Sequence, residues 1–326
     1  MFMVEEKKVL LSGVKPSGRP HIGNYFGALR QFVDLQDQYQ SYIMLADYHA
    51  LISMDQPDEL RQSTTDLAID YLAIGLDPSK TIIFKQSDVP EHTELAWIFN
   101  CLTTMPYLAR AHAYKDAVAK EREVSVGLFD YPLLMAADIL LYEPAVVPVG
   151  QDQKQHVEIA RDTAEKFNRL YGQTFVLPEP LIQDQVKTIV GLDGRKMSKS
   201  YNNTIPLFAT DDEWRQLVMS IKTDSRGVDE PKDPETCGVF ALHRLFSESQ
   251  LMDLEQRYRA GGIGYAESKQ ILADNVIKTL SPLRARRAEV AARLEGVKKI
   301  LVDGAAAARA QAARMMGRVR SRIGVA

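Results

Sequence analysis

The sequence has few cysteines and no long hydrophobic run. Its 326 residues include only Cys101 and Cys237, too few for a disulfide framework. No stretch approaches the ~20 apolar residues of a membrane span, and the first residues lack the basic-then-apolar layout of a signal peptide. The six histidines never fall at metal-ligand spacing with cysteine or carboxylate. We therefore expect a cytoplasmic protein without structural zinc or a membrane partner.

The sequence also lacks a strong excess of charge of either sign. Its formal net charge of −3 argues against a protein that binds nucleic acid over its whole surface. An RNA partner would therefore need a local basic patch. The best candidate for such a patch lies near the end of the sequence and contains Arg309, Arg314, Arg318, Arg320 and Arg322. A solvated helix face is the alternative for any one of them.

Short apolar runs alternate with helical patterns through the first half of the chain. The runs predict strands at residues 8–12, 41–46, 81–85 and 145–149. Helices are predicted between and after them at 24–38, 58–74, 92–102, 131–142 and 153–170. This alternation is typical of an α/β domain with a doubly wound, Rossmann-like parallel sheet, which binds ligands at the carboxyl ends of its strands.

Strand signals stop after Pro206. The remaining pattern predicts helices at residues 211–222, 238–246, 249–259, 266–280, 282–298 and 305–323. We therefore expect a Rossmann-like domain over residues 1–205, a helical domain over 206–300 and a last helix over 301–326 that packs back on the first domain.

Two short segments carry most of the chemical information. Residues 16–24, Pro-Ser-Gly-Arg-Pro-His-Ile-Gly-Asn, join a predicted strand to a predicted helix, a junction that directs backbone N–H groups at an anion. Residues 196–200, Lys-Met-Ser-Lys-Ser, place two lysines and two serines in a polar turn. A nucleoside triphosphate held from both ends needs both segments. The alternative is that the glycines merely turn the chain and the lysines are solvated.

A third feature is a single carboxylate within an apolar helical run. Asp138 follows Met135 by three residues and Tyr131 by seven, which places all three roughly on one helix face. Aspartate is rarely buried without a partner, so a ligand-binding role is favoured over a solvent-facing one. An apolar slot with one acceptor suits indole, whose nitrogen donates and cannot accept.

Residues 16–24 and 196–200 together resemble the HIGH and KMSKS signatures of class I aminoacyl-tRNA synthetases. The run 131–142, the segment 147–156 and the stretches 13–29 and 161–168 are similar to tryptophanyl-tRNA synthetases of the bacterial type. The resemblance is close over about the first 205 residues and covers the rest in helical character. It implies a tryptophan–tRNA ligase that joins L-tryptophan to ATP as an adenylate, releases pyrophosphate and then charges tRNA.

The resemblance assigns a role to each matching position. Asp138 would accept the indole N–H, with Tyr131, Met135, Val147, Val149, Leu11 and Gly13 as walls and Gln153 and His49 at the amino-acid end. The apolar members could instead be ordinary core, and His49 a core histidine. The expected ATP-binding residues are Lys15, Pro16, Ser17, His21, Gly23, Asn24, Gly150, Gln151, Asp152, Ile189, Lys196, Met197, Ser198, Lys199 and Ser200.

Catalysis is then expected from positioning and charge stabilisation, with no covalent enzyme intermediate. Lys196, Lys199 and His21 would act on the phosphates, and Mg²⁺ would arrive with ATP. The family works as homodimers, which places an expected dimer contact around residues 94–110. The region 206–300 would bind the tRNA anticodon.

Lys15 and Ala117 depart from the pattern of many family members, which have Gln and Lys at these positions. We expect the Lys15 ammonium to reach the ATP phosphates. The alternatives are that it points to solvent or compensates for Ala117.

Three rival functions stay open at this stage. They are a tyrosine-activating class I synthetase, a catalytically silent paralogue that binds tryptophan or tRNA, and a small nucleotidyltransferase that uses the His-x-Gly loop alone. An intact 196–200 segment and Asp138 disfavour the second, and the long helical region after Pro206 disfavours the third.

Overall fold

The computed structural model describes residues 7–121, 123–150, 153–181 and 189–325. Its described residues form two compact units. The first takes its residues from 1–18, 31–183 and 293–326, and the second from 19–30 and 184–292. Each unit is described below by itself.

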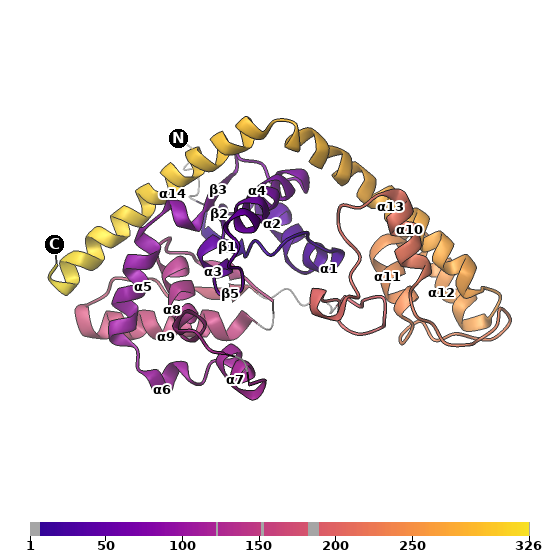
Figure 1. The fold of residues 1–326 in the computed structure, drawn as a ribbon, viewed down its shortest axis with the longest axis horizontal. Coiled ribbons are helices and arrows are strands. Elements are labelled where there is room, and N and C mark those ends of the chain that lie inside the picture. The colour runs from indigo at the N-terminus through magenta and orange to yellow at the C-terminus, as the bar shows by residue number, and fades with distance from the viewer. Residues whose placement is uncertain (1–6, 122, 151–152, 182–188, 326) are drawn as a thin grey trace, which may run out of the picture. The chain divides into compact units, whose positions relative to one another are not determined.

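The first unit is built on a five-stranded parallel sheet with the order β3-β2-β1-β4-β5 (Figure 1). Its strands are β1 (Val9–Val14), β2 (Gln40–Leu45), β3 (Thr81–Lys85), β4 (Val146–Pro148) and β5 (Glu179–Leu181). β1 pairs with β2 in one direction along the sheet and with β4 in the other. The α/β fold class is therefore confirmed, and the four predicted strands are present, with the bounds of β3 as predicted and those of the other three shifted by one or two residues. β5 was missed, because its three residues include a proline and a glutamate.

Helices cover both faces of this sheet. The helices of this unit are α2 (Arg30–Leu35, whose first residue belongs to the second unit), α3 (Asp47–Ala50), α4 (Pro57–Ala73), α5 (Glu91–Leu102), α6 (Met105–Leu108), α7 (His112–Ala119), α8 (Val126–Leu140), α9 (Lys154–Tyr171) and α14 (Leu294–Ile323), with α6 and α7 packed on α8. Tyr42 and Met44 of β2 share one core with α5, α8, α9 and α14. Ile43 and Leu45 alternate with them and are also fully buried, as expected for a strand covered on both faces.

The helix α14 lies unusually close to strand β3. A Cβ atom at Gly304 would lie 2.0 Å from the carbonyl oxygen of Ile83, a separation that no side chain tolerates. Glycine at this position therefore lets the helix backbone rest directly on the strand. Figure 1 shows α14 as one long helix that runs past β3 and α5.

The second unit is helical. It contains α1 (Ile22–Asn24), a π-helical turn (Tyr25–Leu29), α10 (Asp211–Met219), α11 (Gly238–Phe246), α12 (Leu251–Ala260) and α13 (Tyr265–Ala291). Phe240, Leu254, Tyr258 and Ile263 form a buried core. Trp214 is fully buried, and its indole N–H donates to the Pro206 carbonyl at 2.8 Å.

Several predicted helices differ from the structure in their extent. The helix expected over 131–142 is α8, which begins five residues earlier and ends two residues earlier. The single helix expected over 24–38 is divided into α1, the π-helical turn and α2. The boundary expected between helices at 266–280 and 282–298 is absent, because α13 continues through Pro282 and ends at Ala291. α14 begins at Leu294 rather than at residue 305. Proline removes one backbone donor without forcing the chain out of a helix whose other contacts hold it.

In the described part of the chain, no helix combines the length and hydrophobicity needed to cross a membrane.

Candidate active site

Asp138 lies in the interior of the first unit and is held by three side chains. It is 2% exposed and lies in the last turn of α8. Its Oδ1 accepts from Gln86 Nε2 at 2.7 Å and from His92 Nδ1 at 2.6 Å, and its Oδ2 is 2.7 Å from His49 Nε2. Burial alone would raise the pKa of Asp138, but the hydrogen bonds from His49 and His92 lower it to about 2. The carboxyl group is therefore an ionised acceptor at neutral pH.

The sheet explains how these partners reach Asp138. His49 belongs to α3, which follows β2, and Gln86 begins the 3₁₀ turn that follows β3. His92 lies in the first turn of α5, a few residues further along the chain. The carboxyl ends of parallel strands meet at one edge of a sheet, where α/β proteins bind ligands.

Tyr131 and Met135 occupy the same helix as Asp138 and are half-buried. The Tyr131 hydroxyl is 2.6 Å from His156 Nε2, and its ring meets the His49 ring edge-on with centroids 6.1 Å apart. The structure thus places Tyr131, His49 and Asp138 in one neighbourhood. His49 lies on the aspartate itself.

The remaining residues expected around tryptophan lie on or near neighbouring strands. Leu11 on β1 and Val147 on β4 are each 2% exposed, and these two strands are paired. Val149 and Met135 are partly buried and pack against the same core. Gly13 on β1 lies opposite Met44 of β2, where a Cβ would come within 2.7 Å of the Met44 carbonyl oxygen. Gln153 is the N-cap of α9.

In the second unit, His21 and Asn24 form a reciprocal cap at the start of α1. This turn is held to the segment after the KMSKS sequence, because Ile22 N–H donates to the Ile205 carbonyl at 2.9 Å and Leu207 N–H to that of Pro20 at 2.9 Å. Burial and then the charge of Lys199 lower the pKa of His21 to about 4. His21 is therefore neutral at pH 7, with Lys199 close enough to influence it.

The Lys-Met-Ser-Lys-Ser segment lies in a tightly bonded loop. Met197 is 4% exposed, its N–H donates to the Ile189 carbonyl at 2.8 Å, and its Cβ would lie 3.5 Å from a Cβ at Gly23. The segments 16–24 and 196–200 thus meet at Gly23 and Met197. Lys196 and Lys199 are exposed around this anchored methionine.

Asn203 organises that loop and was not predicted as a site residue. It is 2% exposed, its Nδ2 donates to Asp193 Oδ1 at 2.7 Å and to the Lys196 carbonyl at 3.1 Å, and its Oδ1 accepts from Ser198 N–H at 2.8 Å. A Cβ at Gly191 would lie 2.3 Å from Asn203 Nδ2, so only glycine leaves room for this amide.

The expected ATP residues divide between the two units. Lys15, Pro16, Ser17 and Gly150 belong to the first unit, and those from His21 to Asn24 and from Ile189 to Ser200 to the second. Lys15 is exposed, and its Nζ donates to Ser53 Oγ at 3.1 Å. Gln151 and Asp152 lie outside the described residues. Within the described ranges, no group of three or more His, Cys, Asp or Glu side chains could hold a metal ion.

Comparison with known proteins places this geometry in a family. The model of class I tRNA synthetases for tryptophan and tyrosine matches residues 3–281. The tryptophan–tRNA ligase of Fusobacterium nucleatum is 46% identical, with 97% of each chain covered, and that of Rhodopirellula baltica is 46% identical, with 97% of this chain and 99% of the relative covered. The chain belongs to the tryptophanyl-tRNA synthetase family.

A solved structure of this family supports the same assignment. The tryptophanyl-tRNA synthetase of Campylobacter jejuni, crystallised with ADP and tryptophan, is 44% identical and superposes with a TM-score of 0.90. The match covers 97% of this chain and 99% of that one. The resemblance inferred from the sequence is confirmed, and the tyrosine-activating alternative is not favoured.

Proposed function

We propose that this enzyme activates L-tryptophan with ATP and transfers it to tRNA. The observation that carries the proposal is the buried, ionised Asp138 on a helix with Tyr131 and Met135. A carboxylate can only accept hydrogen bonds, and indole nitrogen can only donate one. The family relatives and the complex with ADP and tryptophan support this choice of substrate.

In the proposed reaction, the tryptophan carboxylate attacks the α-phosphorus of ATP and pyrophosphate leaves. Tyr131, Met135, Val147, Val149, Leu11 and Gly13 would enclose the indole ring, and Gln153 would hold the amino-acid end. His49 would help at the amino-acid end, and it also contacts Asp138. A hydroxyl of the terminal tRNA ribose then attacks the acyl carbon of the adenylate, and AMP leaves.

The phosphates of ATP are proposed to meet the Lys196 and Lys199 ammonium groups, which stabilise the negative charge that develops as pyrophosphate leaves. Neutral His21 and the backbone N–H of Gly23 would add hydrogen bonds without a competing charge, and Asn24 would hold the His21 ring in place through the reciprocal cap. Ser17, Ser198 and Ser200 offer hydroxyl groups, and Ile189 an apolar surface for adenine. Mg²⁺ would bind as part of the Mg–ATP substrate.

ATP–pyrophosphate exchange with tryptophan and tyrosine in parallel tests this function. We expect exchange that depends on tryptophan and is far slower with tyrosine. Exchange with tyrosine alone would reverse the substrate assignment, and no exchange with either amino acid would indicate a catalytically silent protein.

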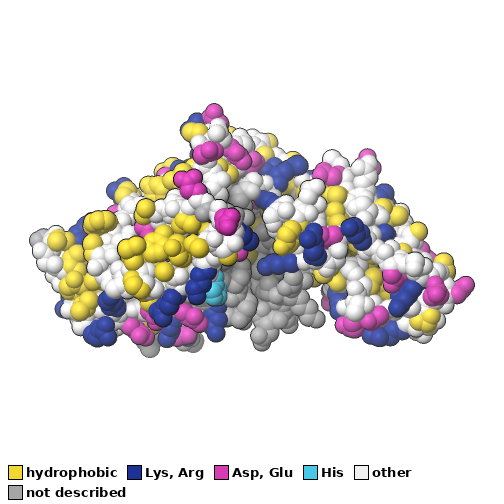
Figure 2. Space-filling view, turned by 60° about the horizontal axis from the view of Figure 1, so that its bottom comes forward, with side chains coloured by type: hydrophobic (Ala, Val, Ile, Leu, Met, Phe, Trp, Pro, Cys, Tyr) yellow, Lys and Arg dark blue, Asp and Glu magenta, His cyan; other side chains and the backbone are white. Residues whose placement is uncertain are grey.

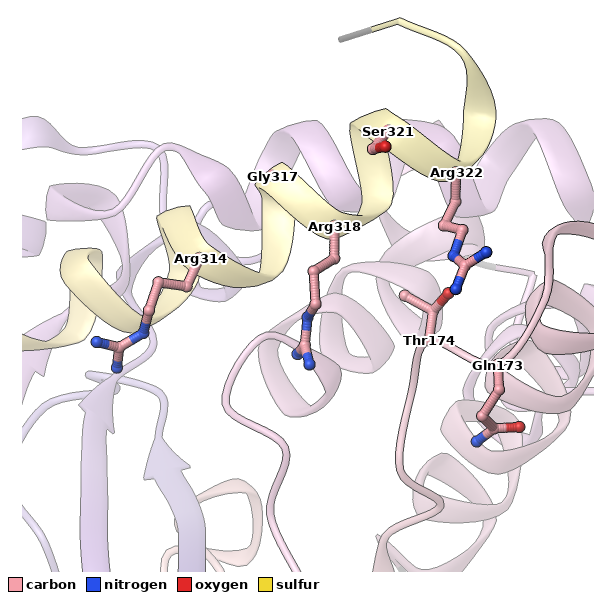
Figure 3. A pocket seen from close by; sticks show the side chains of 7 residues that line it. All are labelled: Gln173, Thr174, Arg314, Gly317, Arg318, Ser321 and Arg322. Carbon is pink, nitrogen blue, oxygen red and sulfur yellow. The ribbon is translucent and has the colours of Figure 1, made fainter.

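We also propose that tRNA contacts a basic groove of the first unit, near the end of α14. Arg314, Arg318 and Arg322 repeat every four residues and extend from one side of the helix, where they line a groove with Thr174 and Gln173, and the Arg322 side chain reaches Thr174 (Figure 3). The groove measures about 530 Å³. Arg318 pairs with Glu143 at 2.7 Å, whereas among the described residues no carboxylate lies within ion-pair distance of Arg314 or Arg322. Phosphodiester groups would supply the missing negative charge.

The other arginines of this stretch are occupied elsewhere. Arg320 binds Glu94 through two hydrogen bonds of 2.7 and 2.5 Å, and Arg309 lies 3.5 Å from Glu91. The expected basic stretch therefore narrows to one side of α14. The region from 206 to 300 remains the proposed anticodon-binding domain, with residues 1–205 as the catalytic domain and 301–326 as the helix that returns to it.

A homodimer through residues 94–110 is the proposed assembly. Trp97 on α5 is 69% exposed and Met105 on α6 is 72% exposed, which is unusual for such large apolar side chains. Figure 2 shows hydrophobic side chains gathered on a face of the first unit, at the left of the view. A second copy of the chain would bury such a surface. Because the substrates are those of translation, we place the enzyme in the cytoplasm.

A further inference from the structure

His92 is a fully buried histidine that joins Asp138 to a tyrosine. Its Nδ1 lies 2.6 Å from Asp138 Oδ1 and its Nε2 lies 2.9 Å from the Tyr142 hydroxyl, with no exposed surface on the imidazole. A carboxylate oxygen only accepts, so Nδ1 carries the hydrogen. The ring is packed against Phe84 at a centroid separation of 6.2 Å. The imidazole therefore has one orientation.

Gln86 fixes the same oxygen from another direction. Its Nε2 donates to Asp138 Oδ1 at 2.7 Å, and its Oε1 accepts from the Tyr48 backbone N–H at 3.1 Å. The backbone contact sets which end of the amide faces the carboxylate. Gln86 is fully buried, so water cannot replace it.

These contacts leave little of the carboxylate free. An ionised carboxylate offers about four acceptor positions, two on each oxygen. Gln86 and His92 occupy the two on Oδ1, and His49 occupies one on Oδ2. One position on Oδ2 remains. It belongs to the oxygen that His49 contacts, and the His49 side chain is 13% exposed whereas that of His92 is fully buried.

We propose that Gln86, His92 and Tyr142 are positioning residues that make Asp138 selective for a ligand with a single N–H donor. The inference rests on the proposed activation of tryptophan and adds to it the residues that set the selectivity. With Oδ1 filled and the carboxyl plane fixed, Asp138 presents one unsatisfied acceptor. A ligand without the N–H leaves that acceptor desolvated and unpaired, whereas a carboxylate free to rotate would find other partners.

The test measures discrimination rather than activity alone. The probes are tryptophan and 3-(benzothiophen-3-yl)alanine, an analogue of nearly the same shape in which sulfur replaces the indole N–H. The ratio of kcat/KM for the two in ATP–pyrophosphate exchange reports the hydrogen bond to Asp138. We expect a ratio of about a hundredfold or more in the wild-type enzyme.

Two substitutions at His92 distinguish the loss of its hydrogen-bond donor from the change of its side-chain volume. His92→Leu removes the donor, and His92→Asn keeps an amide N–H near the place of Nδ1. His92→Leu should lower the ratio by about tenfold or more through a higher KM for tryptophan, with kcat and the KM for ATP nearly unchanged. His92→Asn should restore most of the ratio. His243→Leu is the matched control, because His243 is equally buried but lies in the second unit on Ser247 and Ser268.

Tyr142→Phe removes one oxygen and repeats the test with little risk to folding. It should lower the ratio by about twofold or more. If the ratio is the same in wild type, Tyr142→Phe and folded His92→Leu, or if His243→Leu lowers it equally, the positioning role is overturned. Should His92→Leu fail to fold, Tyr142→Phe decides. Absence of tryptophan-dependent exchange in the wild type would instead overturn the proposed function.

Discussion

His21 and Asn24 cap each other across one helical turn. Asn24 N–H donates to His21 Nδ1 at 3.2 Å, and His21 N–H donates to Asn24 Oδ1 at 3.1 Å. The first contact requires an unprotonated Nδ1. The cap therefore depends on a neutral imidazole, and the lowered pKa of His21 is consistent with this requirement.

His21 should make the enzyme less stable in acid. Its pKa is 6.5 when unfolded and about 4 when folded. The unfolded chain binds a proton first as the pH falls, so the stabilisation is complete above pH 6.5 and is lost between 6.5 and 4, by at most about 3 kcal/mol. The free energy of unfolding, measured with urea across this pH range, should depend less on pH in His21→Asn, which keeps a capping acceptor. Parallel curves for the two proteins would contradict the prediction.

Lys196→Ala and Lys199→Ala should slow adenylate formation and leave tryptophan binding nearly intact. Each lysine is exposed on a loop anchored by Met197, and its charge is needed mainly when pyrophosphate leaves. Loss of either should cost about 2–4 kcal/mol in the transition state. Single-turnover kinetics and calorimetry measure the two effects. Lys278→Ala, which removes an exposed lysine of α13, is the control and should behave as wild type. Normal turnover in both loop variants would remove the assigned role.

Lys15→Gln should raise the KM for ATP several-fold and leave the KM for tryptophan unchanged. Desolvation of its ammonium group lowers the pKa of Lys15, and its Nζ donates to Ser53 Oγ at 3.1 Å. A charged donor binds phosphate about twice as strongly as a neutral one, so Lys15→Ala should be worse than Lys15→Gln. Ser53→Ala removes the hydroxyl and keeps the charge. Identical ATP kinetics in wild type, Lys15→Gln and Lys15→Ala would show that Lys15 is a solvated side chain.

Replacing Arg314 and Arg322 together by Gln should weaken tRNA binding and spare pyrophosphate exchange. The plot of log affinity against log salt should become shallower by about two, one for each lost phosphate contact. Arg320→Gln is the matched control, since Arg320 lies on the same helix but binds Glu94. Fluorescence anisotropy with labelled tRNA measures both quantities. An unchanged slope in the double variant would exclude the groove as an RNA contact, whereas weaker binding of free pyrophosphate alone would indicate a small-anion site.

Trp97→Glu should convert the proposed dimer to a monomer. The substitution places a charge in an apolar contact surface that must lose its water on association. Sedimentation velocity measures the result at several protein concentrations. Met252→Glu changes an 87%-exposed side chain of α12 in the second unit and should leave the sedimentation coefficient unchanged. A wild-type monomer would refute the assembly.

The sequence predicted the parallel sheet because its strands carry their own signal. Residues 81–85 are apolar and β-branched for most of their length, and the predicted bounds match β3 at both ends. The strand β5 has no such run, and pairing with β4 decides its conformation. Pro282 misled the prediction because a proline in one sequence does not reveal whether tertiary packing keeps the helix whole.

Some residues of the candidate site could likewise be predicted from the sequence, and others could not. Asp138 stands out because a lone carboxylate interrupts apolar neighbours, but Gln86 and His92 come from other elements and have no local pattern that ties them to it. Asn203 carries no signal either, since its role depends on Gly191 and Asp193 across a loop. Partners that only the folded chain brings together are invisible to spacing and periodicity.

Gly304 has a consequence that reaches the far end of its helix. A bulkier residue would have to lift α14 from β3 or turn it about its axis. Each residue of an α-helix advances the side-chain direction by about 100°, so a slip of one position would carry Arg314, Arg318 and Arg322 away from the loop at Gln173. The missing Cβ at Gly304 thus fixes how α14 lies on β3. It thereby sets the direction in which the three guanidinium groups face, several turns further along the helix.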